Sequence, residues 1–363
     1  MNVPLPQAIC AGGISLHAPF ATGYSLFAPD SGKDSALSEN LGLDETRRDA
    51  ALHGPIESIR FSGLGAGPAL IVLGAVHGNE ICGPNAIRRA IAACRSGELL
   101  IRRGDVTFVP VANPKAYLQN TREGDRNLNR DLREKPYPAD YEDRIGNRLC
   151  SLLRQHDVLL DIHSFKSPGV PFTFFGPENN RGELEAFRHA DAEGALAACL
   201  GTTIAIHGWL ENYARLLAVR ERIGFPCTSI AEGWGTTEYI RFSGGYGVTL
   251  ECGLHDDPVS AEVGYSAIVN TLAHLGLTDG PAPALRPQTV IHMVDVIVCE
   301  QAGDRLEGRW KTGDAVAAGD LVARRANGEA VRAARPGFII FPNANPKPGE
   351  GICHLGVASD RRI

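Results

Sequence analysis

The stretch Pro68-Ala-Leu-Ile-Val-Leu-Gly-Ala-Val76 is a continuous apolar run, and His77-Gly-Asn-Glu80 follows it directly. An apolar run of this length that ends in a glycine-containing turn is typical of a strand buried on both faces of a sheet. Residues 81–94 then place apolar side chains at helical spacing, and Pro84 is tolerated because it lies in the first helical turn. A buried strand followed by a helix indicates an α/β fold.

Strands and helices continue to alternate along the chain after this first pair. A strand is expected at residues 105–112 and another at 157–163, which a helix at 143–155 precedes. Residues 196–205 and 247–251 supply further helix and strand. This alternation predicts an α/β domain whose mixed or parallel sheet is flanked by helices.

The two ends of the chain differ from this central region. Residues 1–54 are rich in Gly, Pro, Ser and Asp without periodicity, which predicts a loosely structured arm. After a Pro-rich stretch, residues 287–363 contain short strands separated by glycine turns, which predicts a small all-β, barrel-like domain. Part of it looks like half of a biotinyl- or lipoyl-type barrel. A carrier domain needs a lysine on its exposed hairpin, and none occurs between Lys311 and Lys347, so we reject that function.

Composition excludes several functional classes without selecting one. The chain has 363 residues, of which 44% are hydrophobic and 21% charged, as in soluble globular proteins. Its net charge is −6 and it has no basic block, which argues against binding to nucleic acids or anionic membranes. No apolar run approaches the ~18 residues that span a bilayer, and the N-terminal region lacks the positive charge of a secretory signal. The nine scattered cysteines are expected to be reduced, as in a cytoplasmic protein.

Three residues at strand ends have side chains suited to a metal ion. His77 and Glu80 follow the first buried strand, and His163 closes the strand at 157–163. Two histidines and one glutamate suit Zn²⁺ and leave a fourth position for water. Asp161 lies two residues before His163 on the same face of its strand, where it could orient a metal-bound imidazole. Each residue alone could equally be an ordinary turn or core residue, but their joint occurrence favours a metal site.

A polar segment at residues 113–130 follows the second strand. It contains Arg122, Arg126 and Arg130 within nine positions. Because a guanidinium group binds a carboxylate through two parallel hydrogen bonds, this segment suits an anionic substrate. The alternative is a solvated polar loop without a function.

Taken together, these residues resemble the succinylglutamate desuccinylase/aspartoacylase family. These proteins are zinc deacylases related to the metallocarboxypeptidases. The resemblance covers residues 55–280, and a trailing β domain is also typical of the family. It rests on six motifs in the family's order and spacing, which are His77-x-x-Glu80, Asn113-Pro, Arg122, Leu-Asn129-Arg130, Asp161-x-His163 and Leu-Glu251-Cys-Gly253. The resemblance implies a zinc carboxypeptidase-like mixed sheet in a catalytic domain at residues 55–286.

The resemblance also implies roles for individual residues. One Zn²⁺ per chain would be held by His77, Glu80 and His163. Glu251 would act as general base and then as general acid, and Arg122 would polarise the scissile carbonyl. This chemistry is coherent because zinc lowers the pKa of a bound water and a neighbouring carboxylate can take the proton that the water loses.

The substrate-binding segment shows one departure from the family's pattern. The resemblance implies that Asn129 and Arg130 hold the free carboxylate of the substrate. The family often has aspartate where this chain has Asn127, so the function of that aspartate is left open. Asp125, two residues earlier, is the candidate to replace it.

The sequence therefore predicts a zinc-dependent amidohydrolase that acts on an N-acyl amino acid or a related small acylated amine. A metallocarboxypeptidase and a non-catalytic zinc-binding relic are the alternatives. Only 82 residues separate Glu80 from His163, which favours the deacylase. The acyl group and the oligomeric state stay open. The candidates for the acyl pocket, chosen only because they lie near Glu251 in sequence, are Trp209, Tyr213, Trp234, Tyr246 and His255.

Overall fold

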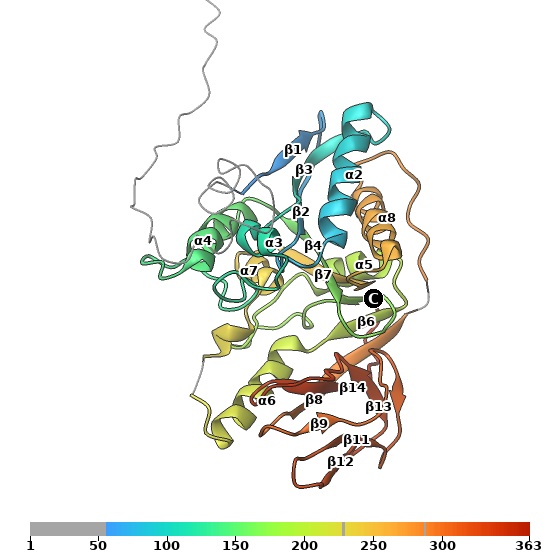
Figure 1. Cartoon of the computed structure of the whole chain (residues 1–363). Coiled ribbons are helices and arrows are strands. Elements are labelled where there is room, and N and C mark those ends of the chain that lie inside the picture. Colours follow the sequence, from blue (N-terminus) through green and yellow to red (C-terminus); the bar gives the residue numbers. More distant parts are fainter. Residues whose placement is uncertain (1–55, 227–228, 287) are drawn as a thin grey trace, which may run out of the picture. The chain divides into compact units, whose positions relative to one another are not determined.

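The computed structural model describes residues 56–363 apart from 227–228 and 287 (Figure 1). The arm expected at residues 1–54 lies outside the described residues. The described part is a mixed α/β structure with one large sheet and one small antiparallel sheet, so the predicted fold class is confirmed.

The large sheet contains eleven strands in the order β1-β3-β2-β4-β7-β5-β6-β8-β14-β13-β10. Its central strands β3, β2, β4 and β7 are parallel, whereas β1 is antiparallel to β3 and β5 is antiparallel to β7. The strands of this first part are β1 Ile59–Ser62, β2 Gly65–Gly74, β3 Arg103–Val109, β4 Val158–Phe165, β5 Phe172–Phe174 and β7 Tyr246–Leu254.

Helices cover both faces of this sheet, as expected for an α/β fold. Alternate side chains of β2 enter different cores: Leu70 and Val72 pack with α2, α5 and α8, whereas Ile71 and Leu73 pack with α4 and α7. Figure 1 shows α2 and α8 side by side. The helices are α2 Cys82–Ser96, α3 Pro114–Gln119, α4 Tyr141–Leu153, α5 Ala190–Cys199, α6 Trp209–Arg222, α7 Thr236–Phe242 and α8 Pro258–His274, with a 3₁₀ turn η2 Ile230–Gly233.

The segment after β3 is held in place by two buried polar side chains. Asn113 caps α3 by accepting a hydrogen bond from the Ala116 N–H at 3.2 Å, and its amide donates to Glu142 Oε1 at 3.1 Å. Glu142 in turn accepts hydrogen bonds from the backbone N–H groups of residues 124–126. Because a buried carboxylate needs such donors, this contact determines the path of the loop that carries Arg122 and Arg130.

The carboxyl ends of β2, β4 and β7 meet at one edge of the sheet because these strands are parallel. In the register of β4 and β7, His163 lies opposite Glu251. After β2 the chain turns through Ala75, whose φ of 47° is in the left-handed region that residues with a Cβ rarely adopt. This turn brings His77 to the same edge as His163.

The C-terminal strands continue the large sheet. Strand β6 Ile204–His207 pairs in parallel with β8 Thr289–Val298, and β8 pairs with β14 Gly351–Ala358. The sheet then ends with β13 Gly337–Ile340 and β10 Ala315–Val316, while β9 Arg305–Leu306, β11 Leu321–Arg324 and β12 Ala330–Arg332 form the small sheet. The expected short strands at residues 287–363 are present, and the domain boundary at residue 286 stays a prediction.

Two further observations concern membrane-spanning helices and the state of the cysteines. No helix within the described residues is both long enough and apolar enough to cross a membrane. Seven cysteines lie in the described part, and all seven are free thiols.

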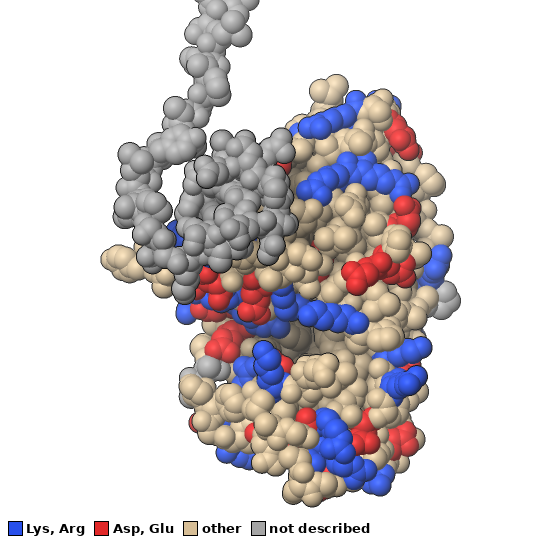
Figure 2. All heavy atoms as spheres, viewed as in Figure 1, with Lys and Arg blue, Asp and Glu red and all other residues tan. Residues whose placement is uncertain are grey.

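Acidic and basic side chains are interspersed over the face shown in Figure 2, and basic side chains gather at a hollow near its middle.

Candidate metal centre and substrate pocket

The three residues proposed as metal ligands converge at the edge of the sheet. His77, Glu80 and His163 are all buried, and each offers a donor atom within 4.8 Å of the others. Glu80 Oε1 lies 2.8 Å from His77 Nδ1, and Glu80 Oε2 lies 2.8 Å from His163 Nδ1. The two Nδ1 atoms are 3.2 Å apart. Two imidazoles and one carboxylate that face one another in this way form a donor set suited to Zn²⁺.

Each imidazole is supported from behind by a second residue. His163 Nε2 lies 2.9 Å from Asp161 Oδ2, and the Thr236 hydroxyl donates to the same oxygen. A metal-binding histidine usually has such a partner on its other nitrogen, which sets the tautomer and the orientation of the ring. The structure thus places Asp161 where the strand periodicity predicted it.

Asn127 supports His77 in the same way. Its Oδ1 lies 3.2 Å from His77 Nε2 and accepts a hydrogen bond from the Asn129 N–H at 2.9 Å. Asp125 does not take this position, because it binds Lys115 Nζ at 2.6 Å. In this chain the amide of Asn127, rather than a carboxylate, therefore lies behind His77.

The charges at the centre shift one another's pKa values. Burial, followed by the nearby charge of Arg122, lowers the pKa of His77 to about 4. Burial also acts on His163, but the carboxylates of Asp161 and Glu80 hold its pKa well above the ordinary value. Burial alone would raise the pKa of Glu80, yet the two histidines keep it well below its usual range. The centre therefore favours an ionised Glu80, as a metal ligand requires.

Glu251 lies beside the centre, opposite His163 in the register of β4 and β7. It is 7% exposed, and its Oε2 atom is buried without a partner among the described residues. Burial raises its pKa well above the ordinary value, although His163 and Arg122 oppose this effect. A buried carboxylate oxygen without a donor is rare in folded proteins and marks a candidate functional group. Arg122 donates to Glu80 Oε1 at 3.2 Å, and its side chain is partly exposed.

These residues line one pocket. Its lining includes His77, His163, Glu251 and Arg122, together with the two residues proposed to bind substrate, Asn129 and Arg130. Six of the seven residues that the sequence suggested therefore border the same space, and Glu80 lies directly behind it. The rest of the lining is Phe174, Phe175, Trp209, Gly233, Gly235, Thr237, Glu238, Arg241, Thr249 and Phe341.

Arg130 is held against aromatic rings. Its guanidinium carbon lies 5.1 Å from the centre of the Trp209 ring and 5.8 Å from that of Tyr213. It donates to the Asn129 carbonyl oxygen at 2.6 Å, and no described carboxylate forms an ion pair with it. Burial lowers its pKa. A half-buried arginine that lacks a carboxylate partner is suited to bind an external carboxylate.

Sequence proximity to Glu251 identified few residues of the pocket wall. Trp209 lines the pocket and Tyr213 packs against Arg130. Trp234, Tyr246 and His255 do not line it. Phe174 and Phe341 were missed, and their rings lie 5.6 Å apart in the wall. No local signal could reveal Phe341, since it directly follows β13 and reaches the pocket only because β8 pairs with β6 and so joins the C-terminal strands to the sheet.

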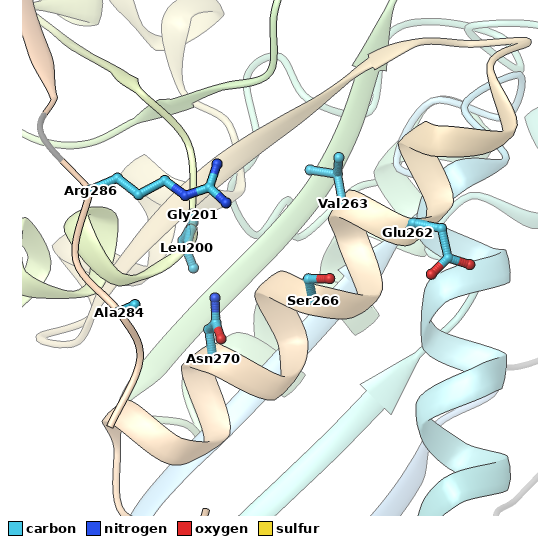
Figure 3. Close-up of a pocket in the computed structure, with 8 residues that line it drawn as sticks. All are labelled: Leu200, Gly201, Glu262, Val263, Ser266, Asn270, Ala284 and Arg286. Carbon is cyan, nitrogen blue, oxygen red and sulfur yellow. The ribbon is translucent and has the colours of Figure 1, made fainter. Parts of the chain in front are cut away.

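A second hollow lies along α8 (Figure 3). It is bordered by Val263, Ser266 and Asn270 of the helix and by Arg286 of the segment that follows it. Its carboxylate, Glu262, forms an ion pair with Arg89. The hollow contains no cluster of metal-ligating side chains within the described part of the chain, so we assign it no chemistry.

The fold and the site thus define an α/β protein with a candidate His/Glu/His metal centre. Residues 66–220 match the family model of the succinylglutamate desuccinylase/aspartoacylase catalytic domain. The match confirms the resemblance seen in the motifs. The matched residues include the three candidate metal ligands and also Arg122, Asn129 and Arg130. Glu251 lies beyond the end of the match. Among curated proteins no match was found.

Several solved structures are similar to this chain. The product-bound ectoine utilization protein EutE (DoeB) from Ruegeria pomeroyi is 24% identical, with a TM-score of 0.63 over 84% of this chain and 89% of that one. A succinylglutamate desuccinylase from Silicibacter sp. TM1040 is 25% identical, with the same TM-score and coverage. A succinylglutamate desuccinylase from Vibrio cholerae is 15% identical, with a TM-score of 0.64 over 84% and 86%. The likeness extends over most of both chains in each case.

Proposed function

We propose that this protein is a zinc-dependent deacylase that hydrolyses the amide bond of an N-acyl amino acid or a related small acylated amine. The observation that carries the proposal is the convergence of three buried donor atoms beside the unpartnered carboxylate of Glu251. The family of residues 66–220 and the bound product in one structural relative agree with a small-molecule substrate.

The metal would be held by His77, Glu80 and His163, one ion per chain. Two histidines and one glutamate are the ligands of several catalytic zinc sites, in which the fourth position is free for water. When bound, zinc supplies Lewis acidity and lowers the pKa of water beside it. Asp161 and Asn127 keep both imidazoles oriented with Nδ1 toward the centre.

Glu251 would move the protons of the reaction. Its carboxylate takes a proton from the attacking water and then delivers it to the nitrogen of the departing amine. Its buried position suits this task, because a raised pKa brings a carboxylate closer to the pH at which both transfers must occur. Arg122 stabilises the negative charge that develops on the carbonyl oxygen.

Arg130 and Asn129 would hold the free carboxylate of the substrate. Arg130 has the charge for this contact, and the rings of Trp209 and Tyr213 keep its guanidinium in position. Binding at this point orients the amide toward Glu251 and lowers the entropy cost of reaching the transition state. The free thiols of the described cysteines suit a reducing compartment, and we propose the cytoplasm.

The test combines activity with metal content. Wild-type protein is assayed on N-formyl, N-acetyl and N-succinyl amino acids and, for the carboxypeptidase alternative, on dipeptides. We expect hydrolysis of N-acyl amino acids and about one zinc per chain. The variant His163→Ala should lose most of its zinc and its activity, whereas His274→Ala, which lies outside the site on α8, should keep both.

Three outcomes would contradict the proposal. Hydrolysis of dipeptides alone would favour the carboxypeptidase. A wild-type protein that binds zinc but hydrolyses no substrate in either group would favour the non-catalytic relic. Full zinc content in His163→Ala would show that His163 is not a ligand.

A further inference from the structure

A second buried group of charged side chains borders the substrate pocket, and we call it the Arg241 cluster. It consists of Arg241 and the carboxylates of Glu185, Glu193 and Glu238. Arg241 Nη1 lies 2.7 Å from Glu185 Oε1 and 3.1 Å from Glu238 Oε1, and Nε lies 3.0 Å from Glu193 Oε2. Nη2 donates to the Gly247 carbonyl oxygen at 3.1 Å. Every nitrogen of this guanidinium therefore has an acceptor inside the protein.

The carboxylates of the cluster are also fixed by other donors. Glu193 accepts hydrogen bonds from the backbone N–H groups of Gly176 and Gly247. Glu238 accepts one from the Gly235 N–H at 2.9 Å. Since the donors lie on separate elements of the fold, Arg241 cannot exchange a carboxylate for a ligand without breaking buried contacts.

The cluster has no excess positive charge. Three carboxylates surround one guanidinium, and burial raises the pKa of Glu185 to about 7. With Glu185 protonated, the two remaining carboxylates still outnumber the one cation. Arg361 does not line the pocket. Its guanidinium donates to the carbonyl oxygens of Gly176 and Pro177 instead. This side of the pocket would therefore repel an anionic group.

The other arginines of the lining are Arg122 and Arg130. Arg122 contacts Glu80 and is assigned to the scissile carbonyl. Arg130 alone among the three pocket arginines lacks a carboxylate partner within the described residues. Much of the remaining wall is neutral: Phe174, Phe175, Trp209, Thr237, Thr249 and Phe341.

We infer that the pocket binds one carboxylate, at Arg130, and selects against substrates that carry a second. The substrate class is an N-acyl amino acid with an uncharged acyl group and no acidic side chain. This inference rests on the proposed deacylase function and makes it narrower. A second carboxylate would have to enter a desolvated space beside a cluster that is already saturated with carboxylates.

The test uses pairs of substrates that differ in one charge and hardly in shape. N-acetylaspartate is compared with N-acetylasparagine, and N-succinylalanine with its terminal amide. We expect the neutral member of each pair to have the higher kcat/KM, by about 100-fold, because like charges brought together in a binding site are strongly unfavourable. Equal or better hydrolysis of either dicarboxylate overturns the inference.

A variant tests whether the Arg241 cluster is the cause. In Glu238→Gln one carboxylate of the cluster is neutral, so the ratio of kcat/KM within each pair should fall by about tenfold. The matched control is Glu262→Gln, which removes an exposed carboxylate on α8 and should leave the ratio unchanged. A ratio that stays the same in Glu238→Gln removes the cluster from the explanation.

Binding separates a failure of the inference from a failure of the proposed function. The same pairs are titrated calorimetrically against zinc-loaded wild-type protein. Tighter binding of the neutral members without any hydrolysis contradicts the deacylase function and supports the selection against a second carboxylate. Tighter binding of the dicarboxylates overturns the selection whether or not they are hydrolysed.

Discussion

Two buried groups of charged side chains lie along the same strand, β7, and they differ in how completely they are paired. The Arg241 cluster surrounds Gly247 near the beginning of the strand, and all its guanidinium nitrogens have acceptors. The candidate metal centre lies beside Glu251, near the end of the strand. There one carboxylate oxygen has no donor within the described part of the chain, and two imidazole nitrogens face each other at 3.2 Å.

This difference in pairing distinguishes buried charges that stabilise the fold from buried charges that are available for binding and chemistry. A buried charge costs free energy unless donors or opposite charges compensate it. In the Arg241 cluster the compensation comes from the protein itself, so the group stabilises one arrangement of α5, α7 and β7. At the candidate metal centre the compensation by the described residues is incomplete, and this agrees with the proposed binding of a metal ion and a substrate. Incomplete pairing is therefore the feature that distinguishes the site.

The largest effect is expected for Glu251→Gln. Glutamine keeps the size of the side chain but cannot accept the proton of water, so kcat should fall about 10²- to 10⁴-fold. Zinc content and melting temperature should be retained, because Glu251 is not among the converging ligands. Steady-state kinetics and metal analysis of the same sample test this. Loss of zinc would show that Glu251 is a ligand. Glu251 would then be paired with the metal, and the contrast with the fully paired Arg241 cluster would no longer hold.

The next effect is on stability and concerns Arg241→Met. It leaves three buried carboxylates without their cation, and the free energy of unfolding should fall by about 3–5 kcal/mol. Denaturant titration measures it. Arg89→Met is the matched control, since its partner Glu262 is exposed and loss of that pair should cost about 1 kcal/mol or less. A similar small loss in Arg241→Met would mean that the cluster does not stabilise the fold.

A third effect follows from the pKa of Glu185, which burial raises to about 7. Because the folded state holds this proton more tightly than the unfolded state, stability falls as the pH rises from about 4.5 to 7. The shift corresponds to about 3 kcal/mol. Glu185→Gln should remove this loss, so the difference in unfolding free energy between variant and wild type should change between pH 5 and pH 8. A difference that is independent of pH contradicts the raised pKa.

The smallest effect concerns the support of the two imidazoles. Asn127→Ala removes the acceptor at His77 Nε2, and the affinity for zinc should fall about tenfold. A competitive titration with a chelator measures the affinity. Asn270→Ala, at the separate hollow on α8, is the control and should not change it. An unchanged affinity in Asn127→Ala would show that the contact with His77 does not orient the ring.

Several features of the site were accessible from the sequence because they depend on local patterns. The apolar run before His77 and the one that ends at His163 predict buried strands, and the carboxyl ends of parallel strands share one edge of a sheet. Two residues of separation place Asp161 and His163 on one face of β4. These rules involve only neighbours in the chain and the regular geometry of strands, so they survive without knowledge of the tertiary structure.

The remaining features were decided by contacts between distant parts of the chain. The Arg241 cluster joins residues from 185 to 241 that share no motif, and Phe341 reaches the pocket from the C-terminal strands. That Asn127 rather than Asp125 supports His77 depends on the path of a loop that Glu142 holds. Such contacts have no period in the sequence, because their free energies depend on which surfaces the whole fold brings together and buries. The sequence by itself determined the candidate ligands, and tertiary structure decided which charges remain free for a substrate.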